Sequence, residues 1–148
     1  MSKKPAVIFD IDGTLADAEH RRHFVQQTPK DWKSFFAAQH LDKAKPNVRW
    51  LLHKMQEIDV PILIVTGRDE EYRELTLRWL TMGNIEPDRF WMRPRGDRRQ
   101  DFEVKEEIYR KYIEPEFNIM LVIDDRDSVV AMWRRLGLEC WQVAAGDF

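Results

Sequence analysis

Three short apolar segments, each followed by a polar cluster, constrain the fold of this chain most strongly. The segments Ala6–Phe9, Ile62–Val65 and Met120–Ile123 are rich in β-branched residues and lack the alternating polar residues of half-exposed strands. This pattern is typical of strands in a parallel sheet that is covered on both faces. A helical repeat of apolar residues follows each segment. Strands that alternate with helices through right-handed crossovers predict an α/β fold, with a three-layer, Rossmann-like parallel sheet.

Apolar residues that recur at helical spacing place the helices. We expect helices after Pro46, over Tyr72–Leu80, over Val104–Ile113, and between Ser128 as N-cap and Gly137 as stop. Weaker strand candidates are Phe90–Met92 and Cys140–Val143.

The segment Ala16–Lys45 is polar with scattered aromatic residues, and it is long for a connection between a strand and its helix. Ligands of this architecture bind outside the carboxyl ends of the strands. We therefore expect the segment to form a small helical cap over a site, with an ordinary extra pair of helices as the alternative. Because no repeat or linker interrupts the rest, residues 1–148 are expected to form one domain with the insertion at 16–45.

Charge and composition exclude several classes of protein. The 24 Lys and Arg residues nearly balance 26 Asp and Glu residues, so binding to nucleic acid or a membrane would need a local patch. The apolar runs are too short to span a bilayer or to serve as a secretory signal. A single cysteine, Cys140, excludes an internal disulfide and a cysteine-based zinc site. We expect a cytoplasmic protein without membrane contact.

Carboxylates and one hydroxyl follow the three apolar segments. The motifs are Asp10-Ile11-Asp12-Gly13-Thr14-Leu15, Thr66-Gly67-Arg68 and Asp124-Asp125-Arg126-Asp127. Each motif alone is also typical of an ordinary turn or helix cap. Parallel strands bring their carboxyl ends to one edge of the sheet, however, so these side chains should converge. Crowded carboxylates favour a divalent cation, and magnesium prefers oxygen ligands. We predict a magnesium site among the four aspartates Asp10, Asp12, Asp124 and Asp125.

These motifs resemble those of the haloacid dehalogenase (HAD) superfamily of phosphotransferases. The match comprises Asp10-x-Asp12-Gly13-Thr14-Leu15, Thr66, Lys105 and Asp124-Asp125, and it covers nearly the whole chain. The resemblance implies that Asp10 is the nucleophile that forms an aspartyl-phosphate, and that Asp12 is first the acid and then the base. It implies that Thr66 holds the phosphoryl group, Lys105 neutralises charge and Asp124 anchors magnesium. An aspartate at the position of Asp12 is the phosphatase form of the motif.

The chemistry of these residue types is consistent with such roles. Phosphoryl transfer depends on in-line positioning and charge neutralisation, and a carboxylate nucleophile splits hydrolysis into two easier steps. Gly13 permits a bend that brings Asp12 back towards the site. Lys105 is expected in the first turn of a helix, where a cation gains nothing from the helix dipole. It is therefore either a site residue or an ordinary surface lysine.

The last third of the chain resembles the 3′-phosphatase domain of phage polynucleotide kinase/phosphatase. The matching segments are Gly96–Asp101, Val104–Ile108, Ile123–Arg126, Met132–Arg135, Glu139–Ala144 and Gly146–Phe148. This resemblance implies removal of terminal 3′-phosphates from DNA or RNA and from nucleoside 3′-phosphates, in the cytoplasm of a phage-infected or bacterial cell. It also implies that Arg21, Arg68 and Asp101 bind the substrate. From the residues alone, Arg21 could equally be solvated, and Asp101 could be a helix N-cap.

Two further features bear on the substrate. The basic segment Arg93–Arg99 either contacts polynucleotide phosphates or is a solvated loop. The aromatic residues Trp32, Phe35 and Phe36 either stack on a terminal base or pack within the insertion. No G-x-x-x-x-G-K-[ST] motif is present, so the kinase part of the bifunctional family is missing from this sequence. The chain is then a stand-alone phosphatase or a piece of a larger protein with a kinase domain.

The leading hypothesis is a magnesium-dependent polynucleotide 3′-phosphatase, a phosphoric monoester hydrolase of nucleic-acid repair. A small-molecule HAD phosphatase resembling a nucleotidase is one alternative. A non-catalytic phosphate-binding module on the same fold is another, since fold alone does not fix function. The complete set of motif residues argues against the module, because a degenerate site would usually have lost one of them.

Overall fold

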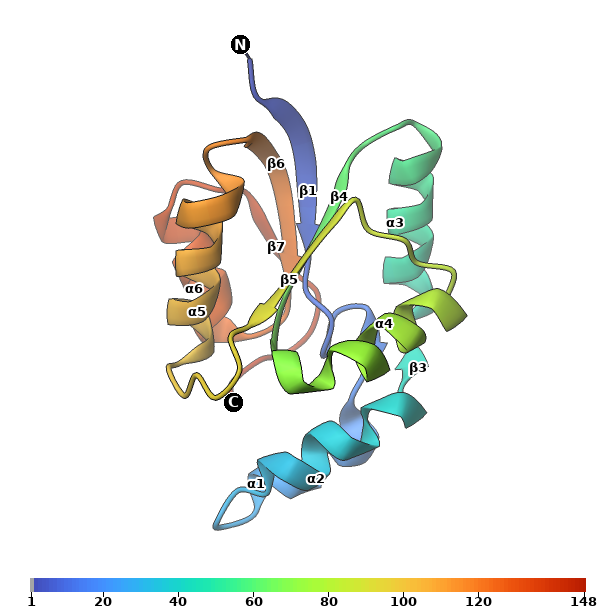
Figure 1. Ribbon diagram of the computed structural model, residues 1–148, viewed down its shortest axis with the longest axis vertical. Helices are drawn as coiled ribbons and strands as arrows, with labels where there is room; N and C mark the ends of the chain where they lie inside the picture. Colours follow the sequence, from blue (N-terminus) through green and yellow to red (C-terminus); the bar gives the residue numbers. More distant parts are fainter. Residues whose placement is uncertain (1) are drawn as a thin grey trace.

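A five-stranded parallel sheet forms the middle layer of the structure, a computed structural model that describes residues 2–148 (Figure 1). The strand order is β5-β4-β1-β6-β7. The strands are β1 (Lys4–Phe9), β4 (Ile62–Asp69), β5 (Arg89–Arg93), β6 (Phe117–Asp124) and β7 (Cys140–Gln142). The predicted α/β class and the predicted strands are confirmed, including the two weaker candidates. Because β1 lies at the centre between β4 and β6, the three motif-bearing strands are neighbours.

Helices cover both faces of this sheet. In Figure 1, α3 (Pro46–Glu57) and α4 (Arg73–Met82) lie on one side, and α5 (Asp101–Ile108) and α6 (Asp127–Arg135) lie on the other. Each face of the sheet has its own hydrophobic core, and the central strand β1 contributes to both. Val7 packs with residues of α3 and α4, and Ile8 packs with residues of α5 and α6. Burial on both faces explains why the apolar segments lack polar alternation.

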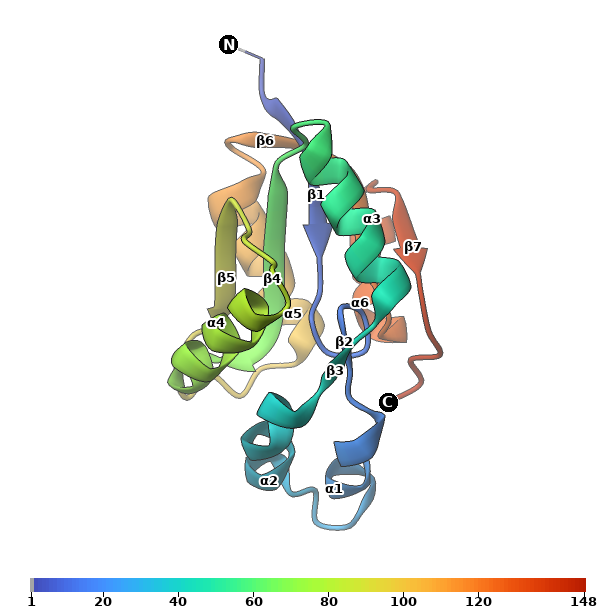
Figure 2. The ribbon, with the colours of Figure 1, turned by 90° about the vertical axis from the view of Figure 1, so that its right-hand side faces the viewer.

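The insertion after β1 forms a cap that lies beyond the carboxyl ends of the strands (Figure 2). Its elements are β2 (Ala16–Asp17), η1 (Glu19–Arg21), α1 (His23–Gln26), α2 (Trp32–Ala37), η2 (Ala38–Leu41) and β3 (Lys43–Ala44). The strands β2 and β3 pair antiparallel and form the stem of the cap. This two-stranded stem was not predicted. It joins the two ends of the insertion, so the cap leaves and rejoins the core at one place.

Among the residues from Ser2 to Phe148, no helix combines the length and the apolar character needed to cross a bilayer.

The helix N-termini differ from the sequence-based expectations. The residue before α6 is Arg126 rather than Ser128, and its side chain forms no capping bond. Instead, the Asp127 N–H donates to the Gly146 carbonyl at 2.8 Å. The N-cap of α5 is Gln100 rather than Asp101, and a reciprocal capping box with Glu103 closes this end. The start of α6 depends on a tertiary contact with Gly146, and the start of α5 uses a Gln cap that the usual preferences rank low.

The region of Lys105 also needs correction. Because α5 begins at Asp101, Lys105 lies in the second turn of the helix and not in the first. The predicted helix over Val104–Ile113 continues beyond α5 as a five-residue π-helical segment, η4 (Tyr109–Ile113). The start of α5 at Asp101 places the side chains of Asp101 and Lys105 one turn apart on the same face.

Burial of α3 gives a direct test of the core. Leu52 is fully buried between α3 and the sheet, so Leu52→Ala should lower the free energy of unfolding by about 2–5 kcal/mol. Met82, at the end of α4, is 80% exposed, and Met82→Ala should change that free energy by no more than about 0.5 kcal/mol. Denaturant titration measures both. Equal losses for the two variants would contradict the packing described above.

Candidate active site

The loop after β1 positions the first two carboxylates. Ile11 and Leu15 are fully buried and anchor the loop in the core. The Ile11 carbonyl accepts the N–H groups of Leu15 and of both its neighbours, which closes a tight turn. Gly13 lies within this turn at φ +84°, a conformation that favours glycine. The anchored turn leaves Asp10 and Asp12 at the carboxyl edge of the sheet.

Three buried carboxylates gather around one buried ammonium at this edge. Oxygens of Asp10, Asp124 and Asp125 lie within 4.8 Å of one another. The Lys105 Nζ donates to Asp10 Oδ1 at 2.8 Å and to Asp124 Oδ2 at 3.1 Å. The hydroxyl of Thr14 donates to Asp10 Oδ2 at 3.0 Å. These contacts tie β1, β6 and α5 together, but they leave the cluster with more negative than positive charge.

The excess charge is visible in the pKa values. Burial, followed by the charge of Asp124, raises the pKa of Asp10 well above its ordinary value, although Lys105 opposes this shift. Burial and Asp124 also raise the pKa of Asp125 to about 6. Burial by itself lowers the pKa of Lys105, but the surrounding carboxylates outweigh it and the pKa is raised well above its ordinary value. This shift favours the charged form of Lys105, and one ammonium does not balance the charge of three carboxylates.

Asp12 has a different environment, because two buried arginines hold it. Arg21 Nη2 donates to Asp12 Oδ1 at 2.5 Å, and Arg68 Nη2 donates to the same oxygen at 2.6 Å. Burial by itself would raise the pKa of Asp12, but Arg68 and Arg21 outweigh it and hold that pKa well below its ordinary value. The cluster of mutually close carboxylate oxygens comprises Asp10, Asp124 and Asp125, and a metal-binding role for Asp12 stays a prediction.

A further buried aspartate, Asp42, completes this second cluster. Arg21 Nε donates to Asp42 Oδ1 at 2.8 Å, and Arg21 Nη2 lies 2.5 Å from Asp42 Oδ2. Arg68 Nη2 is 3.5 Å from the same Oδ2. Arg68 Nη1 also donates to Gln39 Oε1 at 2.5 Å. Asp42 and Gln39 belong to the returning arm of the cap, and the sequence analysis missed both because no strand-end motif marks them.

A cavity of about 560 Å³ opens between this edge and the cap. Its lining includes Asp10, Asp12, Asp101, Asp124 and Asp125. The predicted substrate-binding arginines, Arg21 and Arg68, are fully buried behind Asp12 and are not among the lining residues. Burial excludes the alternative of a solvated Arg21. The geometry assigns both guanidinium groups to the positioning of Asp12, and direct contact with a phosphate stays a prediction.

The remaining predicted site residues lie close to the cavity. The Thr66 hydroxyl is fully buried and accepts the Arg68 N–H at 3.2 Å, while the next residue, Gly67, lines the cavity. Asp101 Oδ2 lies 3.6 Å from Lys105 Nζ. The role of Thr66 as a phosphoryl ligand and that of Asp101 as a substrate ligand stay predictions.

Some arginines of the basic segment Arg93–Arg99 are held by hydrogen bonds and ion pairs within the chain, and others are not. Arg93 donates to the carbonyls of Gly67, Asp97 and Arg99 and therefore shapes the loop. The Arg99 guanidinium pairs with Asp97 and with Glu107. Within the described part of the chain, Arg98 forms no ion pair, and it lines the cavity. Arg95 also forms no ion pair among the residues that the structure describes, so two of the four arginines in the segment are neutralised, and Arg98 is the unpaired one that lines the cavity.

The donor set at the edge fits a divalent cation. The Asp125 Oδ2 is buried and has no hydrogen-bond donor within the described chain. It stands next to Gly13, where a Cβ atom would come within 2.0 Å of it. An unpartnered carboxylate oxygen beside Asp10 and Asp124 is what a hard cation requires, and oxygen-only ligation favours magnesium over softer metals. The residues that could hold it are Asp10, Asp124 and Asp125.

Comparison with known proteins gives one family match over nearly the whole chain. The sequence model of the family HAD_PNKP, described as the polynucleotide kinase PNKP phosphatase domain, matches residues 4–148. A viral protein assigned as a bifunctional polynucleotide kinase/RNA ligase, from Autographa californica nuclear polyhedrosis virus, is 29% identical over 133 residues. That alignment covers 88% of this chain and 18% of the viral protein.

Solved structures give the same picture. A chain of the Pnkp1/Rnl/Hen1 complex superposes with a TM-score of 0.86 at 33% identity, covering 99% of this chain and 48% of that one. In a second structure, described as the Pnkp1/Rnl/Hen1 RNA repair complex, the TM-score is 0.87 at 32% identity, with 99% and 44% covered. A class C acid phosphatase from Bacillus anthracis shares the fold, with a TM-score of 0.65 at 19% identity over 84% of this chain and 53% of that one. The chain therefore spans less than half the length of its more similar relatives.

The carboxylate cluster predicts stabilisation by a divalent cation. A cation that binds only the folded chain at about tenfold its dissociation constant adds about 1.4 kcal/mol of stability. For a chain of this size, that raises the Tm by about 3–6 °C. We expect MgCl2 to raise the Tm by this amount and Asp125→Asn to abolish most of the rise. The exposed control Asp59→Asn should keep it. A Tm that does not respond to MgCl2 in the unsubstituted chain would contradict the assignment of this cluster.

Proposed function

Because this chain belongs to the family of the polynucleotide kinase PNKP phosphatase domain, and is thereby a HAD-type phosphoric monoester hydrolase, we propose that it removes terminal 3′-phosphates from DNA or RNA. The observation that carries this proposal is the pair of aspartates two residues apart in opposite electrostatic environments. Asp10 faces an ammonium and the carboxylates of Asp124 and Asp125, and Asp12 faces two arginines. A nucleophile and a proton carrier need this separation of roles.

The first half-reaction transfers the phosphoryl group to Asp10. A carboxylate oxygen of Asp10 attacks phosphorus, and the bond from phosphorus to the 3′-oxygen breaks. Asp12 gives its proton to that oxygen, which leaves as the 3′-hydroxyl group. Lys105, bonded to Asp10 at 2.8 Å, limits the charge that builds up at the nucleophile. The product of this step is an aspartyl-phosphate on Asp10.

The second half-reaction returns the enzyme to its starting state. Asp12, now ionised, accepts a proton from water while the water oxygen attacks phosphorus. The bond from phosphorus to Asp10 breaks, and inorganic phosphate is released. In the substrate-free chain, Arg21 and Arg68 keep Asp12 ionised. A dianionic phosphate bound at Asp10 would lie in the same cavity as Asp12, and its negative charge raises the pKa of that carboxyl, so substrate binding favours the protonated form of Asp12 that the first step needs.

We propose magnesium as the cofactor, held by Asp10, Asp124 and Asp125. It would neutralise the charge of the phosphoryl group and orient its oxygens. The unpartnered Asp125 Oδ2 and the mutual spacing of the three carboxylates support this assignment.

The proposed substrate class is supported by the relatives of this chain. The relatives include a protein assigned as a polynucleotide kinase/RNA ligase and components of an RNA repair complex, so a nucleic-acid end is the substrate class that they favour. Because the chain spans only part of these proteins, we also propose that it acts beside a kinase or ligase activity, either in a longer chain or in a complex.

Replacement of Asp10 tests the nucleophile. Asp10→Asn keeps the size of the side chain but removes the attacking charge, so phosphate release should fall to background while the far-ultraviolet circular dichroism is unchanged. Beryllium fluoride should inhibit the unsubstituted enzyme by imitating the phosphoryl group on Asp10. The exposed control Asp59→Asn should keep full activity. Turnover by Asp10→Asn within about tenfold of the original rate would rule out the aspartyl-phosphate route, because losing a covalent nucleophile costs far more.

A substrate panel with MgCl2 tests the proposed specificity. Oligonucleotides that carry a 3′-phosphate and nucleoside 3′-phosphates should be hydrolysed, whereas 5′-phosphorylated oligonucleotides should not. Equal hydrolysis of 3′- and 5′-phosphorylated ends would leave the phosphatase chemistry standing but would overturn the 3′ specificity. Hydrolysis of mononucleotides alone would favour the nucleotidase-like alternative.

A further inference from the structure

A row of three aromatic rings runs from the core into the cap and ends at an exposed tryptophan. Phe36 of the cap stacks on Tyr72 of the core, with ring centroids 5.4 Å apart. Trp32 stacks on Phe36 in turn, at 5.9 Å and an interplanar angle of 23°. Phe35 meets both cap rings edge-on and is buried, with the Arg21 guanidinium 4.2 Å from its centroid. Phe35 and Phe36 thus hold the row in place, while Trp32 remains 41% exposed at its end.

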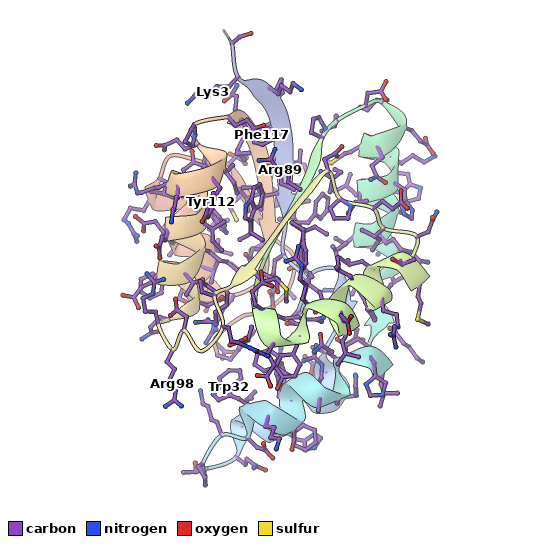
Figure 3. The ribbon with its side chains drawn as sticks, in the orientation of Figure 1. Lys3, Trp32, Arg89, Arg98, Tyr112 and Phe117 are labelled. Carbon is purple, nitrogen blue, oxygen red and sulfur yellow. The ribbon has the colours of Figure 1, made fainter. Side chains whose placement is uncertain are left out.

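The exposed ring belongs to the wall of the catalytic cavity. Trp32 and Phe36 line the same cavity as Asp10, and Arg98 lines it from the loop after β5. In Figure 3, the labelled Trp32 and Arg98 lie on the cap side and the core side of the gap between these two parts. The exposed Lys30 places its Nζ 5.7 Å from the centroid of the tryptophan ring. A nucleotide can displace this solvated side chain without breaking a buried contact.

We propose that Trp32 is the stacking platform for the base of the terminal nucleotide, and that Arg98 faces the next phosphate along the strand. This subsite rests on the proposed 3′-phosphatase function and deepens it. With the 3′-phosphate at Asp10, the three parts of a nucleic-acid end meet matching chemistry in one cavity: carboxylates with a cation, an aromatic face and a guanidinium group. Stacking on a ring face does not distinguish the bases, so the subsite accepts any terminal base.

The test compares one variant on three substrates. Trp32→Ala should lower kcat/KM for a 3′-phosphorylated oligonucleotide by about tenfold to a hundredfold, the range expected for one lost base stack. Hydrolysis of p-nitrophenyl phosphate, which has no base, should change by less than about twofold. In the unsubstituted enzyme, an oligonucleotide with an abasic terminal 3′-phosphate should lose a similar factor, and Trp32→Ala should lower its hydrolysis no further. Trp50, 60% exposed on α3 and outside the cavity lining, provides the matched control Trp50→Ala.

Trp32→Phe keeps an aromatic face and should restore most of the oligonucleotide activity. An equal loss on all three substrates would show that Trp32 only stabilises the cap, and no loss on any would show that it does not meet the base; either result overturns the subsite. Failure of the proposed function has a different signature, because the unsubstituted enzyme would then hydrolyse p-nitrophenyl phosphate but no 3′-phosphorylated oligonucleotide.

An independent observation concerns Asp42, which no motif marks. Asp42 is buried and contacts both arginines that hold Asp12, while the ring nitrogen Nε2 of His20 lies 2.6 Å from its Oδ1. It lies in the returning arm of the cap, next to the stem strand β3. Two guanidinium groups and two carboxylates thus form a closed group across the junction of cap and core, and its net charge is zero when both carboxylates are ionised.

We infer that Asp42 is a positioning residue for the proton transfer by Asp12. By holding Arg21 and Arg68, it fixes the direction in which Asp12 faces the leaving oxygen. Without it, both arginines would turn to Asp12 alone, and the carboxylate would be drawn away from the cavity. Asp42 does not line the cavity and therefore acts only through its neighbours.

Leaving-group dependence separates this role from simple destabilisation. The ratio kcat/KM includes only the steps up to departure of the leaving group, and proton donation matters more for an alkyl alcohol than for p-nitrophenol. Asp42→Asn should therefore lower kcat/KM for a nucleoside 3′-phosphate by about a hundredfold, within the range for general acid catalysis, and that for p-nitrophenyl phosphate by much less. The matched control is Asp17→Asn, since Asp17 is exposed on the facing strand of the same stem.

The double variant of Asp12→Asn and Asp42→Asn should lose no more than Asp12→Asn alone, because both changes remove the same step. Equal losses of Asp42→Asn on both substrates, or losses that add to those of Asp12→Asn, would overturn the positioning role.

Discussion

The buried ammonium of Lys105 is the interaction on which the rest of the site depends. It lies 2.8 Å from Asp10 and 3.1 Å from Asp124, which end neighbouring strands of the sheet. Burying carboxylates at one edge is unfavourable unless cations compensate them. One lysine does not compensate three aspartates, and the raised pKa of Asp125 shows the remaining imbalance. The fold therefore keeps an uncompensated negative charge at this edge, and a bound divalent cation would balance it.

The second constraint is the junction between cap and core. Asp12 is the core's contribution to a buried group whose other members are Arg21 and Asp42 from the cap and Arg68 from the end of β4. Breaking one member of such a group leaves an uncompensated buried charge, so the group holds the cap in a defined position over the cavity. The same contacts give Asp12 an environment opposite to that of Asp10, only two residues away. The same buried group therefore fixes the position of the cap and makes the electrostatic environment of Asp12 differ from that of Asp10.

The sequence was informative wherever a property is local or repeats along the chain. Unbroken apolar runs predicted the strands, and the rule that parallel strands end at one edge predicted that Asp10, Asp124 and Asp125 converge. It was not informative where a side chain depends on partners far away in the chain. From its basic surroundings alone Arg21 could equally be solvated, yet it is fully buried because Asp12, Asp42 and the Phe35 carbonyl accept its hydrogen bonds. Asp42 and the β2–β3 stem were missed for the same reason, since two-residue strands and single aspartates have no periodic signal.

The central claim is that Asp10 carries the phosphoryl group of a 3′-phosphorylated end during turnover. The most direct measurement is mass spectrometry of enzyme that is quenched in acid while it hydrolyses a 3′-phosphorylated oligonucleotide in the presence of MgCl2. Our account predicts that the peptide containing Asp10 gains the mass of one phosphoryl group, and that Asp12→Asn supplied with p-nitrophenyl phosphate, whose leaving group hardly needs a proton donor, increases the trapped fraction because the attack of water is slowed. Turnover without any modified peptide, or with the phosphoryl group on a different residue, would contradict it.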